Sequence, residues 1–172
     1  MALDPGMAFG TGLHPTTRLC LERIEALADR GVLTGARVLD VGCGSGILGI
    51  AAARLGAASV LGVDTDTIAI ESTEANARRN RLAQRVVGRL GSVPSGDGPF
   101  DVVLANLIAS LLVRLAPNLR AELRPGGTIV ASGIFVDREP EVRDAFAAAG
   151  LSVAGRSAKG DWIALEATAG PI

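Results

Sequence analysis

The sequence predicts an α/β fold in which a mostly parallel, seven-stranded sheet carries helices on both faces. Short runs rich in Val and Leu alternate with helix-like segments along most of the chain. The first of these runs ends in a glycine-rich turn that leads directly into a helix. Only a turn separates the last two strand-like segments, so the final strand is expected to run antiparallel.

Composition is typical of a folded protein with one hydrophobic core. The 172 residues are 48% hydrophobic and 20% charged, whereas disordered chains combine low hydrophobicity with high net charge. The 17 basic and 18 acidic residues give a net charge of −1. A protein that binds nucleic acid through phosphates needs clustered positive charge. We therefore expect no direct nucleic-acid binding, and a single domain over residues 1–172.

The few cysteine and histidine residues and the short apolar stretches argue against a metal site and a membrane span. Cys20, Cys43 and the only histidine, His14, lack the spacing of metal ligands, so no metal site is predicted. The longest apolar stretch, 102–113, is shorter than the roughly 18 to 20 residues that span a bilayer. The first residues do not have the pattern of a signal peptide, so none is expected. We expect a cytoplasmic protein that makes no membrane contact.

The first half of the chain predicts a helix followed by alternating strands and helices. Residues 1–14 are too rich in Gly and Pro for a helix and are expected to form a loop. Pro15 suits a first helical turn, and Gly31 is the expected stop of that helix. The elements predicted next are a strand at 37–41, an Ala-rich helix at 47–55, a strand at 59–64, a helix at 67–80 with Asp66 as its cap, and a strand at 86–90.

The second half continues the alternation and ends in a hairpin. A strand is predicted at 100–105, and a helix at 107–123 that Pro117 bends or splits. The later elements are a strand at 127–132 after a Pro125-Gly126 turn, a helix at 139–149 stopped by Gly150, and strands at 151–156 and 162–167 joined by a Lys159-Gly160 turn. The tail at 168–172 is expected to fray.

A glycine-rich turn, Gly42-Cys43-Gly44-Ser45-Gly46, follows the first strand. In a doubly wound sheet, ligands bind at this turn, where glycine lets the backbone approach them and helix N–H groups bind anions. Gly42-x-Gly44-x-Gly46 is the pattern of S-adenosylmethionine enzymes, whereas Gly44-x-Gly46-x-x-Gly49 matches the dinucleotide fingerprint. A tight turn without a ligand is the remaining interpretation.

Two acidic residues accompany the glycine turn. Asp64 ends the second strand 20 residues after Gly44, the spacing of an acid that accepts hydrogen bonds from ribose hydroxyls. The alternative role, capping the next helix, suits Asp66 better. Asp40 precedes the turn inside an apolar strand. It either orients a cationic amino-acid moiety or accepts hydrogen bonds from backbone N–H groups of the glycine turn, and it would repel a pyrophosphate.

These motifs together resemble a known family. Val38 to Gly46 (VLDVGCGSG), followed by Gly62-Val63-Asp64, resembles the class I S-adenosylmethionine-dependent methyltransferases over almost the whole chain. A narrower resemblance comes from DPGMAFGTGLHPTT at 4–17, NLIA at 106–109 and SGI at 132–134. These segments are similar to the ribosomal protein L11 methyltransferases, the PrmA family.

The resemblance implies a seven-stranded sheet whose last strand is antiparallel, with S-adenosylmethionine as cofactor. It implies cofactor contacts at Thr17, Gly42, Asp64 and Asn106, and the glycine pattern adds Gly44. Full-length relatives carry an additional N-terminal domain that recognises the ribosomal protein, and this chain is expected to lack it.

Asn106 is the predicted catalytic residue. An unpaired amide at the end of a hydrophobic strand is costly, so its carbonyl is expected to accept a hydrogen bond from the incoming amine. Alternatively, Asn106 caps the next helix. His14 is either a general base or an anchor of its loop, and Phe9 either lines the transfer pocket or anchors that loop. Backbone groups at Ser92 could meet an adenine edge.

The favoured function is therefore an S-adenosylmethionine-dependent protein methyltransferase. It would act on amines, either lysine side chains or an N-terminal amine, of a large-subunit ribosomal protein. The alternatives are a small-molecule methyltransferase of the same fold, an NAD-dependent oxidoreductase that uses the Gly44 pattern, and a non-catalytic cofactor-binding module.

Overall fold

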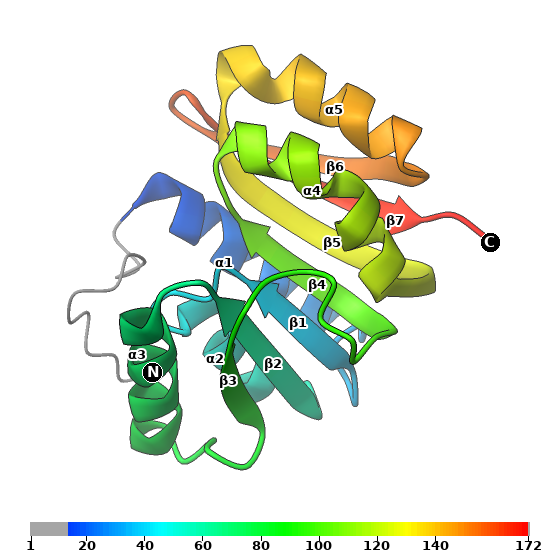
Figure 1. Ribbon diagram of the computed structural model, residues 1–172. Helices are drawn as coiled ribbons and strands as arrows, with labels where there is room; N and C mark the ends of the chain where they lie inside the picture. The colour runs from blue at the N-terminus through cyan, green and yellow to red at the C-terminus, as the bar shows by residue number, and fades with distance from the viewer. Residues whose placement is uncertain (1–13, 172) are drawn as a thin grey trace.

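A seven-stranded sheet with the order β3-β2-β1-β4-β5-β7-β6 forms the centre of the molecule. The computed structural model describes residues 14–171 (Figure 1). The strands are β1 (Arg37–Val41), β2 (Ser59–Asp64), β3 (Val86–Leu90), β4 (Phe100–Asn106), β5 (Leu123–Phe135), β6 (Leu151–Lys159) and β7 (Trp162–Ala169).

Pairing in the sheet confirms the predicted fold class. The four strands β3, β2, β1 and β4 run parallel to one another, and β5 continues parallel to β4. The last strand, β7, lies antiparallel between β5 and β6. Because the carboxyl ends of β1, β2 and β4 lie at one edge of the sheet, the residues that follow them are brought together there.

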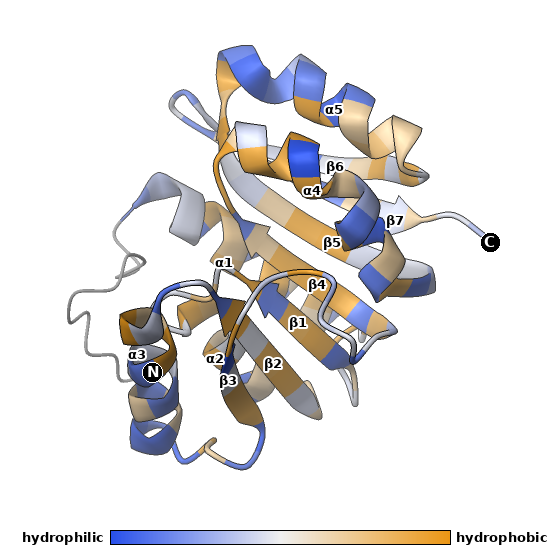
Figure 2. Cartoon of the chain, in the orientation of Figure 1, coloured by the Kyte–Doolittle hydropathy of each residue, from blue (hydrophilic) through white to orange (hydrophobic). Residues whose placement is uncertain are grey.

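Helices cover both faces of the sheet. They are α1 (Pro15–Asp29), α2 (Ile47–Arg54), α3 (Thr67–Arg79), α4 (Ala109–Glu122), α5 (Glu139–Ala148) and the 3₁₀ turn η1 (Val136–Arg138). One hydrophobic cluster joins α1, α2 and part of α3 to one face, and the other joins α4 and α5 to the opposite face. Figure 2 shows the apolar residues concentrated on the central strands and the polar residues on the outer helices.

Three predicted details are wrong, each for a local reason. Pro117 does not split α4, which runs unbroken from Ala109 to Glu122 with Pro117 on its exposed side. The predicted turn at Pro125-Gly126 lies inside β5, where a register shift against β4 absorbs it. Residues 168 and 169 do not fray, because they pair with Thr128 and Leu151 as the end of β7.

Candidate functional site

The glycine turn after β1 adopts a conformation that side chains disfavour. Gly42, Gly44 and Gly46 have φ angles of +70°, +55° and +84°. A Cβ on Gly42 would come within 2.6 Å of the Leu107 side chain. The Gly42 and Cys43 amides both donate to the carbonyl of Val63, at 2.8 and 3.1 Å. The turn is therefore tied to the end of β2.

Asp64 connects that turn to the next helix. Its Oδ2 accepts a hydrogen bond from the Gly44 amide at 3.1 Å, and its Oδ1 accepts one from the Asp66 amide at 3.0 Å. Asp66 itself caps α3, because its Oδ1 accepts from the Ile68 amide at 2.9 Å. The half-buried Asp64 carboxylate thus has a fixed orientation, and each oxygen keeps a further lone pair for a ligand.

Two buried polar residues of α3 hold the turn from the other side. Thr73 donates from Oγ1 to the Gly44 carbonyl at 3.0 Å, and Asn76 donates from Nδ2 to the Ser45 carbonyl at 2.8 Å. Sequence reasoning missed both residues. Their spacing of three residues places them on one side of the helix, and polar residues on an inward helix face would have been the signal.

A cavity of about 330 Å³ opens beside Asp64. Its walls come from the ends of β1 and β2, from the residues after β3 and from the start of α4. They comprise Val41, Gly42, Asp64, Thr65, Gly91, Ser92, Leu107, Leu111, Arg114 and Leu115. The size and the mixture of apolar walls with few polar groups are typical of a small-molecule site. Of the predicted residues, Gly42, Asp64 and Ser92 line the cavity. Gly44 does not line it, but its amide donates a hydrogen bond to the Asp64 carboxylate.

Asp40 is a buried acid at the centre of the sheet, with 2% of its surface exposed. Its Oδ2 accepts a hydrogen bond from the Gly49 amide of α2 at 3.2 Å. Burial raises the pKa of this carboxyl to about 7, against the lowering effect of that hydrogen bond, and the charge of Asp64 raises it further. Asp40 therefore accepts a backbone N–H, as one interpretation expected, but the donor belongs to α2 and not to the glycine turn.

Asn106 is the last residue of β4 and lies half-buried beside Ser132 of β5. The residue at the N-cap of α4 is Ile108, and no side chain caps that helix. The interpretation of Asn106 as a helix cap is therefore wrong. No hydrogen bond commits its amide to any residue from 14 to 171, so it can meet a substrate at this edge of the sheet.

Thr17 lies in the first turn of α1 and is completely buried. Its Oγ1 has no hydrogen-bond partner within the described part of the chain. One turn further along α1, Cys20 is completely buried, and burial together with the charge of nearby Asp40 raises the pKa of its thiol. The start of α1 is thus near the same edge of the sheet, and the orphaned hydroxyl suits a ligand contact.

His14 and Cys43 both make contacts within the protein. His14 caps α1 by accepting from the Thr16 amide at 3.2 Å, and its ring meets Trp162 edge-on with the centroids 5.2 Å apart. This geometry supports the loop-anchor interpretation. Burial raises the pKa of the Cys43 thiol to about 12, and its sulfur accepts a hydrogen bond from Thr73. Phe9 and the rest of the 4–13 segment lie outside the described residues.

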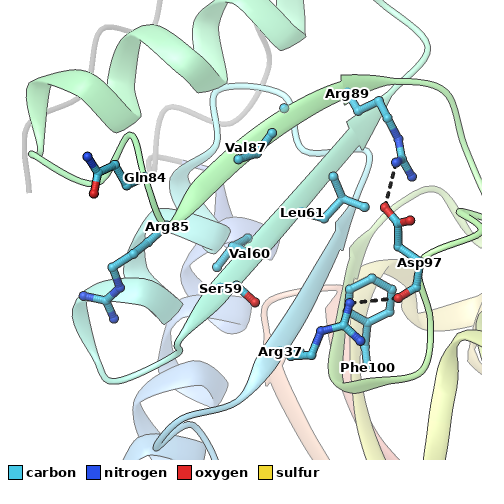
Figure 3. Close-up of a pocket in the computed structure, with 11 residues that line it drawn as sticks. Arg37, Ser59, Val60, Leu61, Gln84, Arg85, Val87, Arg89, Asp97 and Phe100 are labelled. Carbon is cyan, nitrogen blue, oxygen red and sulfur yellow. Dashed lines mark hydrogen bonds and ion pairs between the residues drawn. The ribbon is translucent and has the colours of Figure 1, made fainter.

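A second cavity, of about 360 Å³, opens at the opposite end of the sheet (Figure 3). Arg37 donates there to the carbonyls of Pro99 and Asp97, at 2.7 and 2.8 Å, and its guanidinium lies over the Phe100 ring. Arg89 forms an ion pair with Asp97 at 2.6 Å. These contacts fix the loop between β3 and β4, which has no helix of its own.

Neither a membrane span nor a metal-binding cluster is found among the described residues. None of the helices within 14–171 is long and apolar enough to cross a membrane. Over the same residues, no group of His, Cys, Asp and Glu side chains is placed to hold a metal ion.

The sheet order, the antiparallel β7 and the glycine turn define a class I methyltransferase fold. Magnesium protoporphyrin IX methyltransferase from Synechocystis PCC 6803, a solved structure with bound SAM, superposes with a TM-score of 0.74. It covers 88% of this chain and 78% of that one, at 21% identity. Such a distant likeness concerns the fold alone.

Closer matches identify the family. A family model described as ribosomal protein L11 methyltransferase (PrmA) matches residues 1–169. The ribosomal protein L11 methyltransferase of Chloroflexus aurantiacus is 46% identical over 96% of this chain and 57% of its own length. A crystal structure of ribosomal protein L11 methylase from Lactobacillus delbrueckii subsp. bulgaricus has a TM-score of 0.88 at 36% identity. It covers 98% of this chain and 84% of that one.

The chain belongs to the PrmA family. It spans just over half the length of the curated relatives that it matches.

Proposed function

We propose that this chain transfers methyl groups from S-adenosylmethionine to amine nitrogens of ribosomal protein L11. The observation that carries the proposal is the Asp64 carboxylate, fixed by the Gly44 amide beside a cavity in a member of the PrmA family. Asn106 lies at the end of a neighbouring strand, with its amide uncommitted. A cytoplasmic location is part of the same proposal.

The residues present fit S-adenosylmethionine. Asp64 has lone pairs left for the ribose hydroxyls, and the buried Oγ1 of Thr17 needs a partner. The Gly42 backbone lines the cavity with no side chain in the way. When bound, the cofactor supplies a methyl group already activated on a sulfonium. The protein's task is therefore alignment of the amine with that methyl group.

Asn106 would orient the amine. A lysine amine with a pKa near 10.4 is mostly protonated at pH 7, and freeing its lone pair costs about 4.6 kcal/mol. An apolar pocket beside a cation lowers the pKa of that amine, so no dedicated base is required. In the proposed step, the Asn106 carbonyl accepts an N–H of the neutral amine. The bound cofactor would supply its methyl group to the nitrogen lone pair and leave as S-adenosylhomocysteine, while the amine proton would pass to solvent.

The alternative functions receive less support. An NAD-dependent enzyme would place a pyrophosphate beside the glycine turn, where the Asp64 carboxylate already occupies the Gly44 amide. No contact within the described site favours a small-molecule acceptor over a protein amine.

A transfer assay with purified L11 and radiolabelled S-adenosylmethionine tests the proposal. We expect label in L11, and we expect Asn106→Ala to lower kcat by about 10²-fold or more while S-adenosylhomocysteine affinity stays within about threefold. Gln84→Ala, an exposed change far from the cavity, is the matched control. Binding of the cofactor without any transfer to L11 would contradict the proposed activity.

A further inference from the structure

Arg114 is a cation at the wall of the candidate cofactor cavity, and no residue from 14 to 171 pairs with it. It lines the cavity together with Leu111 and Leu115, its neighbours on the same side of α4. Its exposed side chain makes no hydrogen bond or ion pair with the described residues. Arg120 of the same helix, in contrast, donates to the carbonyls of Leu123 and Gly170.

The two charged residues of the cavity come from different walls. Asp64 ends β2, whereas Arg114 belongs to α4 and shares the cavity with Gly91 and Ser92, which follow β3. A ribose held at Asp64, with the amino-acid end of the cofactor toward Gly42, leaves the base to occupy the remaining part of the cavity. That part is bounded by α4 and by residues 91–92.

A guanidinium suits this position because of its electronic structure. It is planar, weakly hydrated and able to stack on an aromatic ring, and a purine presents such a ring. The leucines of α4 contribute apolar surface around it. A lysine ammonium would supply the same charge without the planar contact.

We propose that Arg114 closes the cavity over the adenine of the bound cofactor, with its guanidinium against the base. The inference rests on the proposed function and adds a residue that determines cofactor affinity. Because S-adenosylmethionine and S-adenosylhomocysteine carry the same adenine, the contact strengthens both equally. A purely electrostatic effect would instead disfavour the sulfonium relative to the neutral thioether.

Calorimetric titration of the purified chain separates these effects. The ligands are S-adenosylmethionine, S-adenosylhomocysteine and 5′-methylthioadenosine, which keeps the base and ribose but lacks the amino acid. We expect Arg114→Ala to weaken all three by the same factor, about 3- to 10-fold. Arg114→Lys should recover only part of that loss. Arg78→Ala removes an equal charge from an exposed position outside the cavity and should change nothing.

The outcomes distinguish this inference from the function on which it rests. Unchanged affinities in Arg114→Ala, with normal binding by the wild-type chain, overturn the role of Arg114 and leave the proposed function standing. A variant that binds S-adenosylmethionine more tightly relative to S-adenosylhomocysteine also overturns it, because the effect is then one of charge. Failure of the wild-type chain to bind any of the three ligands overturns both.

Discussion

At the scale of single residues, Asp64 is oriented before any ligand arrives. Each of its oxygens accepts one backbone N–H, from Gly44 and from Asp66. Such bonds to a carboxylate are charge-assisted and hold its plane in place. A ribose that binds there meets a preorganised acceptor and does not have to order a free side chain.

Replacing Asp64 with Ala should weaken S-adenosylhomocysteine binding by at least about tenfold, because charge-assisted hydrogen bonds contribute roughly 1.5–3 kcal/mol. The measurement is isothermal titration calorimetry on a variant shown to be folded. Asp66→Ala is the control, since it removes the α3 cap but no expected ligand contact. Equal affinity in the Asp64 variant and the wild-type chain would exclude Asp64 from the site.

The two thiols should be inert in the native protein. Burial raises the pKa of Cys43 to about 12 and that of Cys20 well above its usual range, so neither forms thiolate at neutral pH. We expect no alkylation by iodoacetamide at pH 8 on a time scale that labels both thiols in urea. Mass spectrometry of the intact protein gives the readout, and rapid native labelling of Cys43 would contradict its structural role.

At the scale of elements, α3 holds the glycine turn. Thr73 and Asn76 satisfy the carbonyls of Gly44 and Ser45, which are enclosed between helix and turn. The shape of the site therefore depends on a helix that supplies none of the residues lining the cavity beside Asp64.

Thr73→Val should test this dependence. It keeps the shape of the side chain and removes the donor, so we expect a loss of about 1–3 kcal/mol in the free energy of unfolding and weaker S-adenosylhomocysteine binding. Urea denaturation and calorimetry measure the two effects. Thr34→Val, at an exposed position, should change neither. A Thr73 variant with unchanged stability and affinity would show that the turn holds its shape alone.

Regular elements were predictable because their signals are local. The bounds of β1, β2 and β3 match the expected ranges, since each is a short Val- or Leu-rich run bordered by clear turn or helix signals. The extension of β5 depends on pairing with β4, and tolerance of Pro117 depends on which side of α4 faces solvent. Neither property belongs to the local sequence.

The parts of the candidate site that belong to a recognisable sequence motif could be predicted. The glycine turn and Asp64 have a recognisable spacing, and the structure brings them to one cavity. The contact between Asp64 and Gly44, the support from Thr73 and the position of Arg114 arise from the packing of separate elements. The order of residues along the chain does not show which side chains of separate elements come into contact.

At the scale of the whole molecule, a titrating acid is buried on the face of the sheet that α2 covers. Asp40 is in the central strand β1, and Cys20, Cys43 and Asp64 are the titratable groups that interact with it or feel its charge. Its folded-state pKa of about 7 is higher than the ordinary value of 3.8. The folded protein therefore holds a proton that the unfolded chain releases.

This shift makes stability depend on pH with a definite sign. The contribution of Asp40 is fully present below pH 3.8 and is lost as the pH rises through about 7. The difference between the two pKa values of Asp40 corresponds to ~4 kcal/mol in the free energy of unfolding. Asp40→Asn cannot titrate, so we expect its stability relative to the wild-type chain to rise between pH 5 and pH 8. Urea denaturation at both values measures this, and a difference independent of pH would contradict the buried titration.

The most direct test of the central claim is a crystal structure of the chain grown with S-adenosylhomocysteine. We expect density for the nucleoside across the carboxyl ends of β1 and β2. Its ribose hydroxyls should meet the Asp64 carboxylate, and the Gly42 backbone should lie beside the ligand. A clear map in which that cleft is empty, or in which the compound lies elsewhere on the molecule, would contradict it.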